Sequence, residues 1–188
     1  MVPKEYYGRL FTKEQLPVNY HPEALTLESM IKVDKQLRCK RCYSRIEEDW
    51  QLPGGQYYCR ACIVFGRNQE GKELYFFPSK TSEIEFPVLK WFGELTPYQA
   101  KVSEKLLRTY QKQKDSLVHA VTGAGKTEMI YNIVAYVLEN KGHVAIASPR
   151  VDVCRELFLR MKRDFTCSIS LLHAESEPYD GSPLVIAT

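Results

Sequence analysis

The segment from residue 116 to residue 139 constrains the fold more than any other part of the chain. A short apolar run, SLVHAV (116–121), precedes a glycine-containing loop that ends Gly125-Lys126-Thr127. This order predicts a buried strand, a phosphate-binding loop and a helix, the arrangement typical of an α/β fold. We expect Gly142 to end the helix. Its predicted apolar face consists of Met129, Ile130, Ile133, Val134, Val137 and Leu138.

Strand and helix signals alternate through the rest of this region. Thr96-Pro97-Tyr98-Gln99 predicts a helix start, in which Thr96 caps, Pro97 occupies the first turn and Gln99 reaches back to the cap. HVAIAS, SISLLH and PLVIAT read as strands, and residues 149–165 read as a helix. Alternation of this kind predicts a parallel, doubly wound sheet.

The loop has the chemistry that a nucleotide phosphate requires. Ala120 stands where the full pattern has its first glycine, while Gly123 and Gly125 let the backbone approach an anion closely. Lys126 would neutralise the β- and γ-phosphates of ATP, and the Thr127 hydroxyl would hold Mg²⁺. A glycine turn before an ordinary helix is the alternative. The predicted nucleotide contacts in the loop are Thr122, Gly123, Ala124, Gly125, Lys126 and Thr127.

Four of the six cysteines form two C-x-x-C pairs, Cys39 with Cys42 and Cys59 with Cys62, separated by 16 residues. This spacing is typical of a structural zinc site, and Gly54 and Gly55 lie between the pairs, where a hairpin must reverse. Unligated or redox-active thiols and an iron–sulfur cluster are the alternatives. Cys154 and Cys167 have no C-x-x-C partner, so we expect them to be ordinary core or surface thiols.

Composition sets the broad class. The chain has 188 residues, 44% of them hydrophobic, and a net charge of +3, which alone does not indicate a nucleic-acid partner. Neither a signal peptide nor a membrane span is evident, so we expect a cytosolic protein. The segment from Lys32 to Arg45 contains six basic residues and one acidic residue, Asp34. This run is either a solvated surface or a polyanion contact, with Arg38 and Arg41 as candidate DNA contacts.

The sequence divides into four parts. Residues 1–35 read as an N-terminal extension, partly helical between about Pro22 and Lys32, and residues 36–65 read as the four-cysteine zinc module. Residues 66–90 form a connecting β segment with a strand at 74–77, and residues 91–188 are the α/β domain.

Several of these motifs occur together in one known group. LTPYQ, AVTGAGKTE, ASPRVDVCREL, LLHAESEP and VIAT follow the order and spacing of the first motor domain of superfamily 2 helicases. With the cysteine module upstream, the chain resembles the ComFA family, the late competence helicase-like ATPases of Gram-positive bacteria. The resemblance implies a partial RecA-like sheet, and we expect the chain to be an N-terminal fragment, truncated before the Asp-Glu motif that holds Mg²⁺.

The resemblance also implies roles for individual residues. Gln99 would read the adenine edge of ATP, although capping alone could explain it. Ser148, Pro149 and Arg150 match a motif that meets the DNA backbone, although a plain strand-to-helix turn is the alternative. His173 and Thr188 fall where related motors also contact the DNA strand, and for His173 a structural role is the alternative.

A motor of this family implies ATP-driven uptake of single-stranded DNA during transformation, at the inner face of the cell membrane. It also implies a second motor domain, possible oligomerisation, and two kinds of partner, the membrane channel and a phosphoribosyltransferase-like competence protein. The chain alone should bind zinc and should not turn over ATP. Two alternatives stay open: a replication-restart helicase, and a non-enzymatic zinc adaptor with a remnant phosphate loop.

Overall fold

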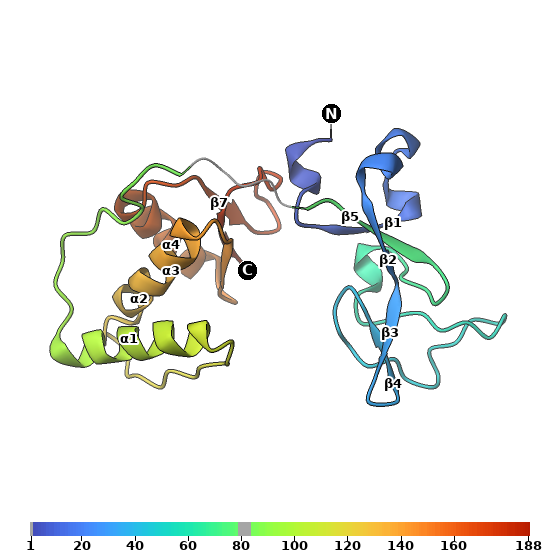
Figure 1. Ribbon diagram of the computed structural model, residues 1–188, viewed down its shortest axis with the longest axis horizontal. Helices are drawn as coiled ribbons and strands as arrows, with labels where there is room; N and C mark the ends of the chain where they lie inside the picture. Colours follow the sequence, from blue (N-terminus) through green and yellow to red (C-terminus); the bar gives the residue numbers. More distant parts are fainter. Residues whose placement is uncertain (1, 79–83) are drawn as a thin grey trace. The chain divides into compact units, whose positions relative to one another are not determined.

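The computed structural model describes residues 2–78 and 84–188. The chain forms two compact units, Met1–Lys80 and Thr81–Thr188 (Figure 1). The division of the sequence at residues 36, 66 and 91 stays a prediction. Within the described ranges, no helix is both long enough and apolar enough to cross a membrane.

The first unit contains a three-stranded antiparallel sheet in which β5 (Glu73–Phe76) lies between β1 (Leu10–Thr12) and β2 (Leu25–Glu28). The predicted strand at 74–77 is therefore present as β5. Aromatic side chains from this sheet form a small core, in which the rings of Phe11 and Phe77 meet edge to face at 6.2 Å between centroids. This core also holds Val2, Leu16 and Tyr75.

A β-hairpin carries the first cysteine pair. Strands β3 (Met30–Val33) and β4 (Gln36–Cys39) pair antiparallel, joined by Asp34 and Lys35, which both have positive φ. Two such residues make the primed turn that matches the twist of the flanking strands. The unit also has short 3₁₀ helices, η1 (Lys4–Tyr6), η2 (Lys13–Gln15), η3 (Val18–Glu23) and η4 (Ile63–Phe65).

The helix expected between Pro22 and Lys32 was a wrong prediction. Only the 3₁₀ helix η3 reaches Pro22, and strands β2 and β3 follow it directly. Each of these strands pairs with a neighbour, β2 with β5 and β3 with β4. These pairings satisfy the backbone hydrogen bonds of the segment, so tertiary context overrides its weak local helix signal.

The second unit is a mixed α/β fold with a parallel sheet, as the alternating pattern predicted. The sheet order is β6-β8-β7, with both pairings parallel and Ala147, Ala187 and Leu172 level with one another. Helix α4 packs against β7 and β8, α3 packs against β6, and α1 packs against α2 and α3. The elements are β6 (Val144–Ala147), β7 (Ile169–Leu172), β8 (Leu184–Ala187), α1 (Pro97–Gln111), α2 (Lys126–Met129), α3 (Tyr131–Glu139) and α4 (Val151–Asp164).

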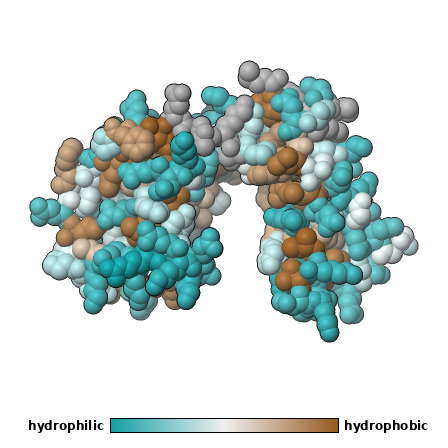
Figure 2. Space-filling view, viewed as in Figure 1, coloured by the Kyte–Doolittle hydropathy of each residue, from teal (hydrophilic) through white to brown (hydrophobic). Residues whose placement is uncertain are grey.

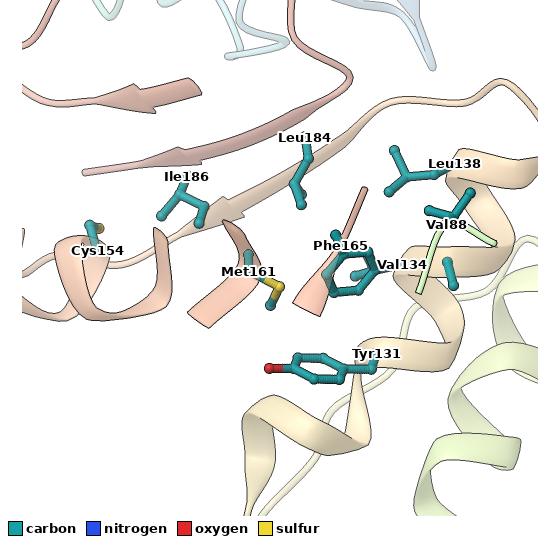
Figure 3. Packing of buried hydrophobic residues seen from close by; sticks show 10 residues of the cluster. Val88, Tyr131, Val134, Leu138, Cys154, Met161, Phe165, Leu184 and Ile186 are labelled. Carbon is teal, nitrogen blue, oxygen red and sulfur yellow. The ribbon is translucent and has the colours of Figure 1, made fainter. Parts of the chain in front are cut away.

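The core of this unit lies between the sheet and helices α3 and α4 (Figure 3). Tyr131 meets Phe165 edge to face, with 5.3 Å between ring centroids, and its hydroxyl donates to the Asp164 carboxylate at 2.7 Å. Figure 3 shows this pair among the side chains of Val88, Val134, Leu138, Met161 and Leu184, and the same cluster continues to Ile186 and Cys154, which lie farther from the pair. Cys154 is fully buried here, in agreement with a core role, and Cys167 is half-buried at the edge of the cluster.

The strand predicted at 116–121 is the clearest difference from expectation. Within the described part of the chain these residues join no strand, and Leu117 and Val121 are 96% and 79% exposed. Instead, residues 115–119 line one groove together with α1 side chains that include Val102 and Leu106. A β-strand needs a neighbouring strand to share its backbone hydrogen bonds. The α1 residues that line the groove belong to a helix, so they offer no such pairing to residues 116–121. Figure 2 shows that other apolar side chains also reach the surface among hydrophilic ones.

The helix after the loop is also interrupted. Helix α2 ends at Met129 and α3 begins at Tyr131, with Ile130 between them. At the other end, α3 stops at Glu139, just before the predicted end at Gly142, and the left-handed residue is Lys141 (φ 60°). The amide of Lys141 donates to the Leu138 carbonyl, and that of Gly142 donates to Val137. These two bonds form a Schellman motif, with Gly142 one position beyond the left-handed residue.

Candidate functional site

The loop at 120–127 has the backbone shape that a phosphate-binding loop requires. Gly123 and Gly125 both have positive φ, 81° and 72°, and Gly125 is the N-cap of α2. The left-handed conformation of Gly125 favours glycine, and a Cβ atom added there would lie 2.3 Å from the side-chain nitrogen of Gln99 and displace that side chain from the loop. Thr122 and Gly123 are exposed, which leaves the loop open to a ligand from solvent.

Gln99 connects the start of α1 to this loop. Its Oε1 accepts from the Thr96 amide at 2.9 Å, and the Thr96 hydroxyl accepts from the Gln99 amide, so the predicted capping box is present. The Nε2 of the same side chain donates to the Ala124 carbonyl at 2.9 Å. One side chain therefore caps a helix and holds the loop at the same time.

Lys126 lies over the loop. Its Nζ donates to the carbonyls of Val121 and Ala120, at 2.8 and 3.3 Å. The ammonium group is exposed, so it is free to exchange these carbonyls for phosphate oxygens. Thr127, the predicted Mg²⁺ contact, follows in the first turn of α2 and is half-buried.

The next residue, Glu128, fixes the loop to another helix. Its carboxylate accepts from Arg160 of α4 at 3.3 Å, and Arg160 also pairs with Glu156 at 2.9 Å. The first pair links the helix that follows the loop to the helix that covers the sheet, and the second lies within α4. Asn132 of α3 adds a separate link, since its amide donates to the buried Ser103 hydroxyl of α1 at 3.2 Å.

The residues predicted to contact DNA in this unit gather at one edge of the sheet. Ser148 follows β6, His173 follows β7 and Thr188 follows β8, and the three parallel strands end level with one another. The amide of Ser148 donates to the Ala187 carbonyl, and that of Thr188 donates to Leu172. Ligands of open α/β sheets bind at this carboxyl edge.

Within this group, three side chains have local partners, and the Ser148 hydroxyl accepts from the Arg150 amide at 3.5 Å. Arg150, the N-cap of α4, pairs with the exposed carboxylate of Asp152. The Nδ1 of His173 accepts from the Glu175 amide at 3.3 Å, which is the structural role named above as an alternative. Pro149 stands directly before the N-cap, and no side chain caps α4.

The four cysteine sulfurs form one compact centre. All four Sγ atoms lie within 4.8 Å of one another, and the Cys39–Cys62 and Cys42–Cys59 pairs are 3.7 and 3.6 Å apart. Four sulfurs at about 2.3 Å from one tetrahedral zinc ion would be about 3.8 Å from each other. The donor set and its spacing therefore fit zinc. Cys39, Cys59 and Cys62 are buried, and Cys42 is exposed.

The environments of the four thiols differ. Burial raises the pKa of Cys59 and of Cys62, and for Cys62 the hydrogen bond from Arg41 opposes that effect. Burial acts in the same direction on Cys42, but its hydrogen bonds with Ser44 and with the neighbouring thiols outweigh it and bring its pKa to about 7. Cys42 thus differs from Cys59 and Cys62 both in its exposure and in the direction of its pKa shift.

The two arginines predicted to contact DNA here both have partners inside the first unit. Arg38 lies over the Tyr43 ring at 5.1 Å and donates to the Tyr43 carbonyl at 3.2 Å. Arg41 donates to Cys62 and to nearby carbonyls. Sequence reasoning missed this role of Arg41, although its position inside Cys39-x-x-Cys42 was a usable signal. It also missed Asn68, whose amide donates to the Cys39 sulfur at 3.2 Å and which no motif marks.

Comparisons with known proteins indicate the family of the chain. A family model described as Type III restriction enzyme, res subunit, matches residues 92–179. The chain is 53% identical over 187 residues to competence protein ComFA of Streptococcus pneumoniae. This alignment covers 98% of the chain and 42% of that protein. It is 33% identical over 186 residues to ComFA of Bacillus subtilis, covering 95% of the chain and 40% of that protein.

The chain thus spans about two fifths of the length of the curated relatives it matches. No solved structure matches it significantly. The family match begins just before α1 and includes the phosphate loop, α4 and the strand β7.

Proposed function

The chain belongs to the ComFA family of competence proteins, and from that premise we propose that it is the nucleotide-binding part of a DNA-stimulated ATPase. This motor would act in the uptake of single-stranded DNA, at the inner face of the cell membrane. Its partners would be single-stranded DNA, the membrane channel and a phosphoribosyltransferase-like competence protein. A loop with two left-handed glycines, tethered by Gln99 and covered by Lys126, carries the proposal.

In this proposal, the loop residues bind the phosphates of ATP by electrostatic attraction and hydrogen bonds. The amides of residues 122–127 and the Lys126 ammonium would hold the phosphates. The Gln99 side chain, which contacts the loop, would also contact the adenine. Thr127 would hold Mg²⁺, which supplies neutralisation of charge on the phosphates. The link from Glu128 to Arg160 would transmit changes at the loop to α4 and thus to the proposed DNA edge.

Hydrolysis needs parts that we place outside residues 1–188. Strand β6 pairs with β8 on one side only, and 116–121 is an apolar segment that joins no described strand. We infer that a strand from residues beyond 188 inserts between them and completes a RecA-like sheet. That strand would end in the Asp-Glu pair that holds Mg²⁺ and orients the attacking water.

The test uses the sequence that follows Thr188 and a chain extended to include it. We expect an Asp-Glu pair about 20 to 30 residues on, after an apolar run. Amide hydrogen exchange at 116–121 should slow in the extended chain, because the segment gains ladder hydrogen bonds. Unchanged exchange there would contradict the completed sheet. Steady-state ATP turnover by the 188-residue chain alone, lost in Lys126→Ala, would contradict the assignment of hydrolysis to later residues.

The four-cysteine centre is proposed as a structural zinc site in the same protein. The zinc ion would supply a cross-link between the β3–β4 hairpin and the segment that carries Cys59 and Cys62. A unit with such small apolar cores needs a link of this kind. Under the alternative hypothesis of a non-enzymatic zinc adaptor, the zinc site is present but ATP is not hydrolysed. A measurement of ATP hydrolysis therefore separates the motor hypothesis from the adaptor hypothesis.

A further inference from the structure

The guanidinium group of Arg41 points into the first unit, where all three of its nitrogens donate hydrogen bonds. Nε and Nη2 donate to the Cys62 sulfur at 3.3 and 3.1 Å, and Nη2 also donates to the Cys62 carbonyl at 2.8 Å. Nη1 donates to the Phe65 carbonyl, and Nη2 donates further to that of Gly66. Arg41 therefore binds one thiol sulfur and three carbonyls of the segment around η4.

A second side chain does the same for another sulfur. The amide of Asn68 donates to the Cys39 sulfur at 3.2 Å and to the Ser29 carbonyl at 2.8 Å. Asn68 is 1% exposed, and its backbone carbonyl accepts from the Cys59 amide at 2.9 Å. Its side-chain oxygen has no hydrogen-bond partner among the described residues, so the two bonds from its amide nitrogen fix the orientation of the side chain. A charged sulfur is a stronger acceptor for such a donor than a neutral thiol.

The negative charge of a zinc-bound cysteine centre explains why these hydrogen bonds would stabilise it. Four thiolates around one Zn²⁺ carry a net charge of two minus, and three of the four cysteines are buried. A guanidinium group that shares two N–H donors with one thiolate offsets part of that charge. The fork of Arg41 also fixes the direction from which Cys62 reaches the metal, because it holds the carbonyl and the sulfur of the same residue.

We propose that Arg41 is a positioning residue of the metal centre, assisted by Asn68, and that it slows the release of zinc by holding the Cys62 and Cys39 thiolates. This proposal rests on the zinc site proposed above. It also replaces the DNA contact predicted for Arg41, because every guanidinium nitrogen already has an acceptor inside the unit. Such outer contacts raise metal affinity about 10- to 100-fold in other proteins.

The experiment measures zinc release from the 188-residue protein to a colorimetric chelator. Zinc content of the wild type is determined first, with Cys62→Ser as the variant that removes a ligand. Arg41→Ala is then compared with Lys40→Ala, which removes a neighbouring positive charge whose side chain is exposed. Arg41→Lys keeps the charge and loses the fork. The cobalt-substituted forms report the thiolate environment through their charge-transfer band.

We expect about one zinc per chain in the wild type, release about 10- to 100-fold faster in Arg41→Ala, and near wild-type release in Lys40→Ala. Arg41→Lys should stay closer to Arg41→Ala than to wild type, and both should shift the cobalt band. Wild-type release in Arg41→Ala or Arg41→Lys, with zinc present, would overturn the positioning role alone. Absence of zinc from the wild type would instead overturn the metal centre and the positioning role with it.

Discussion

At the scale of single residues, Gln99 makes two contacts that belong to different functions. Its Oε1 closes the capping box with Thr96, and its Nε2 holds the Ala124 carbonyl of the phosphate loop. Both atoms are fixed by their partners, so the side chain does not have to choose between the cap and the loop. The sequence suggested an adenine contact and a helix cap as alternatives. The structure contains the cap together with a loop contact that the sequence did not suggest, and the adenine contact stays a prediction.

Substitution of Gln99 can separate these roles. Gln99→Glu keeps an oxygen for the Thr96 amide but places a carboxylate against the Ala124 carbonyl, so nucleotide affinity should fall while helix stability is kept. Thr96→Ala removes the cap alone and should cost about 1 kcal/mol of stability. Nucleotide titration and thermal unfolding of both variants check this. Equal nucleotide affinity in Gln99→Glu and wild type would show that the loop contact is dispensable.

Asp164 is a buried carboxylate whose pKa depends on its neighbours. The hydrogen bonds from Arg163, and to a smaller extent the one from Tyr131, hold the pKa of Asp164 below its usual range against the opposing effect of burial. A lowered folded-state pKa adds stability that is complete above the unfolded value of about 3.9 and is lost as the pH falls through the folded value. Acid unfolding should therefore respond to these contacts.

Tyr131→Phe tests this response. The variant keeps the ring in the core and removes the hydrogen bond to Asp164, so unfolding free energy at neutral pH should fall by about 1 to 2 kcal/mol. The pKa of Asp164 should rise, which moves the acid-induced loss of stability to higher pH. Urea unfolding at several pH values measures both effects. Tyr136→Phe, on the same helix, is the control, and an equal loss in both variants would argue against the Asp164 bond.

At the scale of elements, most helices and strands of the second unit follow from the sequence. The Thr96 cap, the apolar runs and the loop glycines are local signals, and α1, β6, α4, β7 and β8 form where they predict. The failures have non-local causes. Residues 116–121 have the pattern of a buried strand but no described strand pairs with them, and β2 and β3 owe their conformation to partners that local pattern cannot reveal.

The candidate sites divide in the same way. Cysteine spacing and the Gly-Lys-Thr loop are local in sequence, so both were evident before the structure. The partners of Arg41 lie 21 to 25 residues away, and Asn68 lies 29 residues from Cys39, so their contacts depend on the fold. The position of Arg41 inside Cys39-x-x-Cys42 was the one local signal for its role at the cysteine centre, whereas the basic run suggested a solvated surface or a polyanion contact.

The end of α3 offers a stability test at the same scale. Lys141 adopts a left-handed conformation that costs a non-glycine residue about 1 to 2 kcal/mol. Lys141→Gly should raise the unfolding free energy by about 0.5 to 1 kcal/mol, after the greater freedom of glycine in the unfolded chain is counted. Lys141→Ala should give no such gain. Thermal unfolding compares the two, and equal stability would show that the strain is absent.

The proposed DNA edge is an element-scale feature because three strand ends and the start of α4 form it. Arg150→Ala should lower the salt dependence of single-stranded DNA binding by the equivalent of about one phosphate contact, a slope change of about 0.7. Arg155→Ala, an exposed arginine on the same helix, is the matched control. Fluorescence anisotropy across a salt series gives the slopes. Equal slopes for Arg150→Ala and wild type would exclude Arg150 from the interface.

At the scale of the whole molecule, the chain joins a four-cysteine unit to an α/β unit that carries a phosphate loop. Each site has a complete local environment, since the cysteines have Arg41 and Asn68, and the loop has Gln99 and Glu128. Hydrolysis is the one function for which these described residues supply only half of the chemistry. We therefore propose that this chain binds nucleotide and that ATP turnover requires the longer protein.

The most direct test of that claim is ATP hydrolysis by the protein extended past Thr188, with and without single-stranded DNA. We predict turnover that DNA stimulates, and its loss in Lys126→Ala while zinc content stays unchanged. The 188-residue chain should show no steady-state turnover under the same conditions. If the extended protein does not hydrolyse ATP with DNA present, or if Lys126→Ala hydrolyses it at the wild-type rate, the motor assignment is wrong and the zinc adaptor is favoured.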